Sequence, residues 1–400
     1  MTETDPLGQI TSYSYDGFGQ RLSRTDPNGH TTAYVYDAQG NRTAITNPLG
    51  QVTQTAYDAA GRPIAVTDAN GHATTLAYDG NDRLLSTTNA LGHTVASVYD
   101  AEGNRTQVTD PQGQTSVTVF DANDQVLSET DTTGAITAYG YDAADQRITQ
   151  TDPLGNLTRF GYDAGHRLIQ VTDALNQVIR YSYDPNGNRL TQTDPLGHIV
   201  TSDWDALNRL IRVTDPLGHA TAWQYDALGQ RTAMTDAQGR LTAYDYDALD
   251  RLVRVTDPAG NSSLADYDAV GNRLSVTNPN GQDTRYTYDA AGRRLTETNA
   301  LNQVTTWQYD AVGNPIRRTD AKGQVTQYGY DAGNRLVSVH YADATTVAFS
   351  HDANGNLTQM VDPLGTTTYS YDARNRLTGH TDPFGRPSAT TTTPPATASR

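Results

Sequence analysis

Carboxylates are the side chains best placed to do chemistry in this 400-residue sequence, because aspartate recurs in two columns along almost its whole length. One column follows an aromatic residue every 21 residues, as in Tyr15-Asp16, and the other opens stretches such as Asp194-Pro195-Leu196-Gly197. Stacked carboxylates could form ladders that bind calcium. We favour a structural role, because an Asp that opens a turn caps its own backbone, and because Asn replaces it at Asn47, Asn89, Asn278 and Asn299. The glycine-rich nonapeptide of calcium-binding solenoids is also missing.

Histidines are the second group with possible metal chemistry. Five of them follow a turn glycine, and some are one period apart, so that they could approach each other on adjacent units: His30, His72, His93, His198 and His219. The same column holds Gln, Asn, Thr or Arg in other units, which suits an exposed turn residue better than a ligand. We therefore expect no metal site.

Catalytic motifs are missing from the sequence. It has no Gly-x-Ser-x-Gly elbow, His-Glu-x-x-His pair, phosphate-binding loop or dinucleotide fingerprint. Paired carboxylates recur in every unit, and no local context singles one out. The least regular stretch, 339–351, is interpreted as a decayed turn in preference to a functional insertion. The sequence therefore predicts no enzyme, no catalytic residues and no cofactor.

The spacing itself is the strongest signal, because a fixed period of this length is typical of units that stack on their neighbours. The aromatic-Asp pair occurs 18 times, and its spacing slips once, to 20, before Tyr371. We expect its aromatic column to be structural. It comprises His351 and the following residues: Tyr15, Tyr36, Tyr57, Tyr78, Tyr99, Phe120, Tyr141, Tyr162, Tyr183, Trp204, Tyr225, Tyr246, Tyr267, Tyr288, Tyr309, Tyr330 and Tyr371.

Each unit has two turn signals. Asp194-Pro195-Leu196-Gly197 and Asp184-Pro185-Asn186-Gly187 have the residue preferences of a type I turn followed by a glycine at positive φ. The turn glycines of the Asp-Pro-Leu-Gly type are expected at Gly8, Gly29, Gly50, Gly71, Gly92, Gly113, Gly155, Gly197, Gly218 and Gly260. Segments of about six residues between the turns alternate in polarity, so that Thr32, Tyr34 and Tyr36 share one face of a strand.

These elements predict an all-β protein in which tandem 21-residue β-hairpins form a curled or spiral antiparallel sheet. Open sheets of more than about ten strands curl, split or close. We treat residues 4–385 as one array of about 18 repeats. Residues 386–400 are rich in Thr, Pro and Ala, and we expect a low-complexity, disordered tail.

Composition limits the partners. The net charge is −16 and the pI is about 4.8, which argues against nucleic acid or an anionic membrane surface. No apolar run is long enough for a membrane helix, and Met1 to Asp5 do not begin a signal peptide. The sequence has no cysteine, which leaves the compartment open.

The consensus Arg-Leu-x-x-x-Thr-Asp-Pro-Leu-Gly-x-x-Thr-x-Tyr-x-Tyr-Asp-Ala-x-Gly-Asn-Arg, read from segments such as 189–209 and 273–294, resembles the bacterial Rhs or YD-repeat family. The resemblance covers nearly the whole chain. It implies a β-hairpin spiral that closes into a hollow shell, as in teneurins and the C components of insecticidal toxin complexes. It further implies a secreted or cell-surface protein, with a C-terminal polymorphic toxin as cargo and secretion machinery as partner.

Two points qualify this resemblance. The family's self-cleaving aspartyl core is not recognisable, because Asp362-Pro363-Leu364-Gly365 and Asp382-Pro383-Phe384-Gly385 match ordinary turns. Rows of Tyr and Trp could also stack on sugar rings, so a cell-surface or secreted carbohydrate-binding fibre is the alternative function. For the aromatic column itself we favour packing within the sheet.

Overall fold

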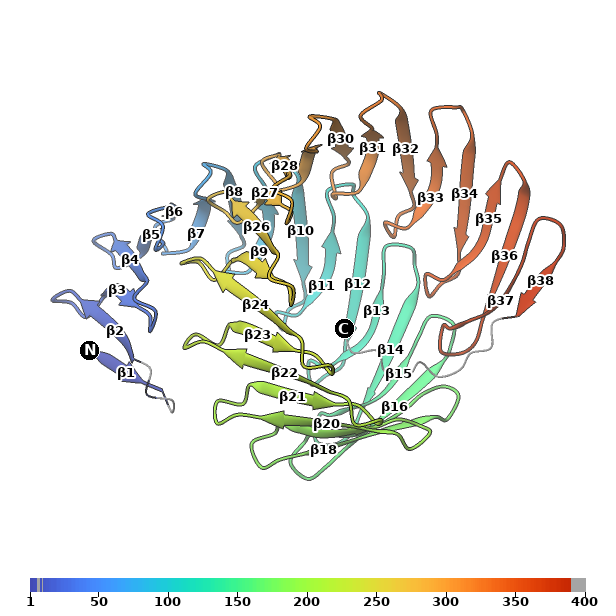
Figure 1. The fold of residues 1–400 in the computed structure, drawn as a ribbon, viewed down its shortest axis with the longest axis horizontal. Helices are drawn as coiled ribbons and strands as arrows, with labels where there is room; N and C mark the ends of the chain where they lie inside the picture. The colour runs from blue at the N-terminus through green and yellow to red at the C-terminus, as the bar shows by residue number, and fades with distance from the viewer. Residues whose placement is uncertain (6–7, 9, 390–400) are drawn as a thin grey trace. The chain divides into compact units, whose positions relative to one another are not determined.

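The chain folds entirely into strands and turns. The structure is a computed structural model and describes residues 1–5, 8 and 10–389, which contain 38 strands and no helix. The strands form one antiparallel sheet, and consecutive strands such as β20 to β24 lie side by side, joined by short turns (Figure 1). The predicted fold class, an all-β array of 21-residue hairpins, is confirmed.

The strands alternate between lengths of five and six residues over most of the chain. The first half comprises β1 (Thr2–Thr4), β2 (Ile10–Tyr15), β3 (Arg21–Thr25), β4 (Thr31–Tyr36), β5 (Arg42–Thr46), β6 (Val52–Tyr57), β7 (Pro63–Thr67), β8 (Ala73–Tyr78), β9 (Leu84–Thr88), β10 (Thr94–Tyr99), β11 (Arg105–Thr109), β12 (Thr115–Phe120), β13 (Val126–Thr130), β14 (Ile136–Tyr141), β15 (Arg147–Thr151), β16 (Leu157–Tyr162), β17 (Leu168–Thr172), β18 (Val178–Tyr183) and β19 (Arg189–Thr193).

The second half comprises β20 (Ile199–Trp204), β21 (Leu210–Thr214), β22 (Ala220–Tyr225), β23 (Arg231–Thr235), β24 (Leu241–Tyr246), β25 (Leu252–Thr256), β26 (Ser262–Tyr267), β27 (Arg273–Thr277), β28 (Asp283–Tyr288), β29 (Arg294–Thr298), β30 (Val304–Tyr309), β31 (Pro315–Thr319), β32 (Val325–Tyr330), β33 (Leu336–His340), β34 (Thr346–His351), β35 (Leu357–Asp362), β36 (Gly365–Tyr371), β37 (Leu377–Thr381) and β38 (Pro387–Ala389).

Two compact units divide the chain, and each is made of two segments that are distant in sequence. Unit 1 contains residues 1–94 and 181–304, and unit 2 contains residues 95–180 and 305–400. We refer to 1–94 and 95–180 as the N-terminal segments of their units, and to 181–304 and 305–389 as the C-terminal segments. Contacts between the segments of one unit are described below.

Nearly every repeat has two turns of the same design. The YD turn begins at the Asp of the aromatic-Asp pair: Asp37 N–H donates to the Asn41 carbonyl at 2.9 Å, and Gly40 N–H donates to the Asp37 carbonyl at 3.1 Å. The TD turn begins at the other Asp and repeats this pattern at Asp26, whose N–H donates to the His30 carbonyl at 3.0 Å. Each turn therefore reverses the chain within a hairpin.

A β-bulge accompanies the aromatic column. Val35 pairs with Ala44, but Tyr36 pairs with Arg42, so Thr43 is the extra residue in β5. The same shift occurs at Tyr246, between β24 and β25. A bulge inserts one residue into one strand and re-aims the side chains beside it. The bulge lets strands of five and six residues pair with each other. A repeat of 21 residues, which is an odd number, therefore fits the sheet.

The sheet has one aromatic face and no second layer over it among the described residues. In β4, exposure alternates so that Thr32, Tyr34 and Tyr36 are half-buried while their neighbours are exposed. No large side chain in the described residues is fully buried, and among them only Ala233, Val339 and Thr367 are less than about a tenth exposed. Stability must therefore come mainly from contacts along the sheet and at its turns, rather than from a core.

Three places depart from the regular repeat. The turn at 362–365 is one residue tighter, because Asp362 pairs directly with Gly365, and this explains why the spacing falls to 20 before Tyr371. The irregular turn at 341–345 keeps its hydrogen bonds, as the decayed-turn interpretation predicts. Strand β38 pairs with β37, although the sequence places it in the tail that begins at 386. The rest of the predicted tail, 390–400, lies outside the described residues.

Candidate functional site

The aromatic column joins successive repeats through hydrogen bonds at the bulges. Tyr36 Oη donates to the Arg21 carbonyl at 3.0 Å, and Tyr246 Oη donates to the Arg231 carbonyl at 2.9 Å. In each case the acceptor lies 15 residues earlier, at the bulge of the preceding repeat. The same bond is made by Tyr57, Tyr141, Tyr162, Tyr225, Tyr267, Tyr288 and Tyr330.

Three residues stand in place of Tyr in the aromatic column, and they differ in whether they make this hydrogen bond. Trp204 keeps the bond, because its Nε1 donates to the Arg189 carbonyl at 3.1 Å. Phe120 has no polar atom with which to make it. His351 is buried enough to shield its Nδ1, which has no hydrogen-bond partner among the described residues. The arrangement uses the Tyr hydroxyl, or the Trp204 indole N–H, to join one repeat to the next.

The aspartates of both turn types cap their own turns. Asp58 Oδ1 accepts from the backbone N–H groups of Ala60 and Arg62 at 2.9 and 3.0 Å, and Oδ2 accepts from the Arg62 guanidinium at 2.8 Å. The Arg62 backbone N–H, followed by its side chain, lowers the pKa of Asp58 below its ordinary value. Carboxylates used in this way act as charged caps and have little capacity left for a ligand.

The turn glycines named from the sequence all lie at positive φ. Gly8, Gly29, Gly50, Gly71, Gly92, Gly113, Gly155, Gly197, Gly218 and Gly260 have φ between 79° and 88°. In turns without glycine, the same position is held by residues that tolerate this region, such as Asn208 at 58° and Asp250 at 64°. The conformation therefore belongs to the turn and is independent of any binding role.

Arginine is the functional residue type that the sequence reasoning missed. It stands four or five residues after the YD Asp in most repeats, and the chain has only one lysine, Lys322. At the first position, Arg251 Nη2 pairs with Asp247 Oδ2 at 2.7 Å, Arg251 Nη1 donates to the Asp268 carbonyl at 2.7 Å, and the guanidinium lies 4.8 Å from the Tyr267 ring centre. One planar side chain thus links two successive YD turns, which a lysine could not do.

At the second position, arginine covers the aromatic face. Arg231 lies 5.0 Å from the Trp223 ring centre, and Arg273 lies 5.4 Å from that of Tyr286. Such cation–π contacts are worth roughly 0.5–1 kcal/mol when exposed. In the sequence, lysine is scarce, and most repeats have an Arg either four or five residues after the YD Asp. This signal could have revealed both groups of arginines.

Within each unit, TD turns of the N-terminal segment contact YD turns of the C-terminal segment, and we call this contact the seam. In unit 1, Asn70 Nδ2 donates to Asp268 Oδ2 at 3.1 Å. In unit 2, Gln112 Nε2 donates to Asp310 Oδ2 at 2.8 Å, and Thr132 Oγ1 donates to the Ala332 carbonyl at 2.6 Å. The partners are 198 to 200 residues apart. The two segments of a unit are therefore held edge to edge by their turns.

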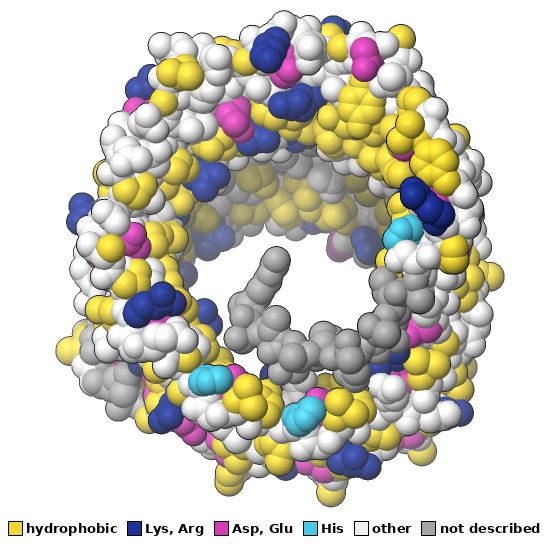
Figure 2. Space-filling view, turned by 45° about the vertical axis from the view of Figure 1, so that its right-hand side comes forward, with side chains coloured by type: hydrophobic (Ala, Val, Ile, Leu, Met, Phe, Trp, Pro, Cys, Tyr) yellow, Lys and Arg dark blue, Asp and Glu magenta, His cyan; other side chains and the backbone are white. Residues whose placement is uncertain are grey.

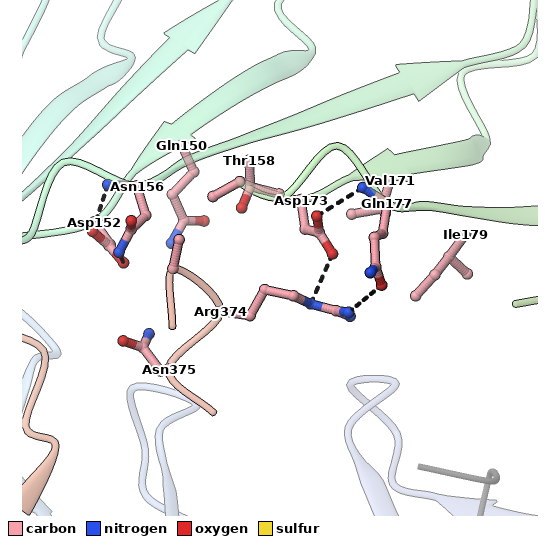
Figure 3. A pocket seen from close by; sticks show the side chains of 12 residues that line it. Gln150, Asp152, Asn156, Thr158, Val171, Asp173, Gln177, Ile179, Arg374 and Asn375 are labelled. Carbon is pink, nitrogen blue, oxygen red and sulfur yellow. Dashed lines mark hydrogen bonds and ion pairs between the residues drawn. The ribbon is translucent and has the colours of Figure 1, made fainter. Parts of the chain in front are cut away.

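A polar cavity of about 340 Å³ lies at the seam of unit 2 (Figure 3). Arg374 reaches across it and pairs with Asp173 Oδ2 at 2.7 Å, and it also donates to Gln177 Oε1 at 2.6 Å. Asn354 Nδ2 donates to Asp152 Oδ2 at 2.7 Å on the same seam. Both carboxylates are already paired, so the cavity is part of the seam and has no activated group.

The calcium and histidine hypotheses gain no support from side-chain placement. Within the described ranges, no three His, Asp or Glu side chains come together as a metal-binding group. His198 Nδ1 and His219 Nδ1 instead lie 2.8 and 3.0 Å from the Oδ2 of their own turn aspartates, Asp194 and Asp215. The pairing of these two histidines with the aspartate of their own turn therefore explains where their side chains lie.

The visible surface shows no large field of one charge. Figure 2 shows acidic and basic side chains scattered among hydrophobic ones over the face that it draws. In the part of the chain that the structure describes, no helix is long and apolar enough to span a membrane.

Comparison with known proteins supports the same architecture. The family model described as RHS Repeat matches the chain repeatedly between residues 1 and 387, with gaps only at 116–119, 200–203, 263–266 and 347–350. No curated protein sequence matches the chain.

Two of the solved structures that are similar in fold belong to Tc toxins. One is a structure of the Photorhabdus luminescens Tc holotoxin pore with a mutation in TccC3, at 14% identity and a TM-score of 0.63, covering 95% of this chain and 29% of that chain. The other is a crystal structure of TcdB2-TccC3-Cdc42, at 14% identity and a TM-score of 0.51, covering 93% of this chain and 26% of that chain. The chain thus spans less than a third of the length of each of these two chains.

Proposed function

Because the chain belongs to the RHS repeat family, we propose that it is the wall of a structural shell that encloses and helps to deliver a polymorphic toxin in competition between cells. The observation that carries this proposal is the single-layer sheet, whose aromatic face has no second layer over it in the described residues. An enclosing wall needs such a layer, stiffened along its length by the Tyr, Asp and Arg contacts and closed edge to edge by the seam.

The proposal assigns no chemistry to this chain. Its carboxylates cap turns, its tyrosine hydroxyls bond to bulge carbonyls, and its arginines pair or stack, so each column of polar residues has a structural use. We propose accordingly that the chain is not an enzyme. The toxin cargo, the secretion machinery and a secreted or cell-surface location remain parts of the proposal that rest on family membership and on the similarity in fold to the Tc holotoxin pore.

Carbohydrate binding is the competing proposal, with the chain as a surface fibre. The arginines count against it, because they already cover aromatic ring faces, as Arg21 does at 4.7 Å from the Tyr34 ring centre. A sugar would have to displace them to stack.

Small-angle X-ray scattering of the purified chain distinguishes the two proposals. A pair-distance distribution with a deficit of short distances, as for a hollow or strongly curved body, is the expected result. An extended rod would overturn the shell proposal. Glycan-array binding that is lost when Trp223 and Trp307 are replaced by Ala would then support the fibre.

A further inference from the structure

The seam uses only half of the turns in each unit, and the unused turns differ in a consistent way. The hydrogen bonds and the ion pair of the seam described above all join TD turns of the N-terminal segments to YD turns of the C-terminal segments. None of them involves a TD turn of the C-terminal segments or a YD turn of the N-terminal segments. Each unit therefore has a second TD edge and a second YD edge that are uncovered.

Apolar turn tips mark the uncovered TD edge. We call the third and fourth residues of a turn its tip, and in TD turns the third residue is often Leu. In the seam, these side chains are 36% to 50% exposed: Leu49, Leu91, Leu154 and Leu175. On the uncovered TD edge they are 62% to 82% exposed: Leu196, Leu217, Leu301, Leu364 and Phe384. The same turn type thus keeps more apolar surface in water where no YD turn lies against it.

Acidic tips mark the uncovered YD edge. Four successive YD turns of the N-terminal segments carry an exposed acid in their third or fourth position: Asp82, Glu102, Asp124 and Asp145. Phe18, 94% exposed, is the apolar exception on this edge. The YD turns that take part in the seam carry neutral, basic or apolar residues there instead, as in Val270, Ala291, Val312 and Arg374.

Asp250 is an acid in the seam whose surroundings include a carboxylate of the other segment. It is the one acidic tip among the YD turns of the C-terminal segments. Burial and then the negative charge of Asp26, a TD aspartate of the N-terminal segment, raise the pKa of Asp250 above its ordinary value. Most TD turns begin with an aspartate, the exceptions among the regular turns being Asn47, Asn89, Asn278 and Asn299. Several acidic tips in a row would therefore be repelled by the aspartates of a TD edge.

We propose that the uncovered TD edge is a docking surface for further RHS repeats whose YD turns have neutral tips, and that the acidic tips of this chain prevent its own copies from occupying that surface. The occupant follows from the seam, which already joins TD and YD edges within each unit. Charges placed on an exposed edge are a common device against unwanted edge-to-edge association.

The test uses the full chain and two sets of substitutions. The neutral-tip variant carries Asp82→Asn, Glu102→Gln, Asp124→Asn and Asp145→Asn. Asn suits the three aspartate positions, which lie at φ 61° to 63°, because Asn208 and Asn302 take a similar positive φ of 58°. The edge variant carries Leu196→Ser, Leu217→Ser and Leu301→Ser at exposed tips. Leu264→Ser, at a strand residue 42% exposed, is the matched control for lost apolar surface. Unchanged circular dichroism and melting temperature establish that each variant is folded.

Mass in solution is measured by light scattering at about 10–200 μM, a range suited to a weak interface. The wild type is expected to stay monomeric, and the neutral-tip variant to associate, with at least a tenfold loss of affinity when the edge substitutions are added and none with Leu264→Ser. A chain that combines neutral tips with the edge substitutions should bind the wild type, because it offers only the YD edge.

Two results would overturn the proposal. One is a neutral-tip variant that remains monomeric and does not bind the wild type. The other is association that the edge substitutions leave unchanged, or that the wild type shows as strongly as the neutral-tip variant.

Discussion

The repeat that ends at Tyr246 and the repeat that ends at His351 have the same backbone and different side chains. In the first, the turn at 236–240 has Asp at its start and Gly239 at φ 77°. In the second, Tyr341 and Ala344 hold these positions, yet Tyr341 N–H still donates to the Thr345 carbonyl at 2.9 Å, and Ala344 takes φ 65°. The number of residues in the turn and the neighbouring strands are therefore sufficient to set its backbone.

What differs between the two repeats is the stabilisation that the columns contribute. Tyr246 donates to a bulge carbonyl, whereas His351 Nδ1 has no partner in the described part of the chain. Asp236 caps its turn and pairs with Arg240 at 2.7 Å, whereas Tyr341 offers no carboxylate. The column residues thus stabilise a conformation that the repeat length already imposes, and substitutions at both repeats can test this distinction.

Acid should have the largest effect, because it acts on many turns together. Backbone N–H groups of the arginine four residues later are the main cause that lowers the pKa of Asp58, Asp163 and Asp236. These folded pKa values lie below that of an unfolded Asp, about 3.9, so the stabilisation is complete above that pH and is lost as pH falls through the folded values. Urea unfolding should show constant stability from about pH 6 to 8 and a steep loss below about pH 4. Equal stability at pH 7 and pH 3 would contradict this role of the caps.

Gly197→Val should have the largest effect of the single substitutions. Gly197 has φ 88°, and a Cβ added to it would meet no atom within 4 Å, so the cost comes from the backbone alone. A β-branched residue in this region should destabilise by about 2–3 kcal/mol, measured by urea unfolding. Gly197→Asn is the control and should cost well under half as much. Equal losses would show that the turn, unlike that of Ala344, depends on something other than φ.

Tyr246→Ala should destabilise the regular repeat by about 2 kcal/mol, through lost packing and a lost hydrogen bond. Limited proteolysis should show faster cleavage near residue 246. Tyr246→Phe removes only the hydroxyl and should cost about 1 kcal/mol. If both variants are digested like the wild type, the proposed packing role of the column fails.

His351→Tyr tests the comparison from the other side, because it supplies the donor that the irregular repeat lacks. We expect a gain of about 0.5–1.5 kcal/mol from the new bond to the carbonyl 15 residues earlier. His351→Phe fills similar space without a hydroxyl and should give little of this gain. A melting temperature that rises equally for both would assign the effect to packing instead.

Ala344→Gly should have the smallest effect, a gain of about 0.5–1 kcal/mol, because glycine relieves the cost of φ 65° but adds entropy to the unfolded chain. Hydrogen exchange at Ala344 and Thr345 should slow correspondingly. A loss of stability would mean that the turn at 341–345 is not strained.

Most of the repeat could be predicted locally. The two turns, the strand faces and the positive φ of the glycines follow from short motifs such as Asp194-Pro195-Leu196-Gly197, whose chemistry acts over four or five residues. The bulge beside Tyr36 and the two arginine positions were missed, because their partners lie in the neighbouring strand or repeat. The Tyr36 bond, for example, spans 15 residues and depends on where the bulge places the Arg21 carbonyl.

The sequence by itself determined the period, the hairpins and the identity of each column, because these depend on residues within one unit. Only the tertiary structure decided which turns meet across about 200 residues, as Asn70 and Asp268 do, and which remain uncovered, as Leu217 does. The repeats are nearly equivalent, so no local motif selects one turn as the partner of another. The strands between two such turns each add a small twist, and the sum of these twists, which is a property of the folded sheet, selects the turns that meet.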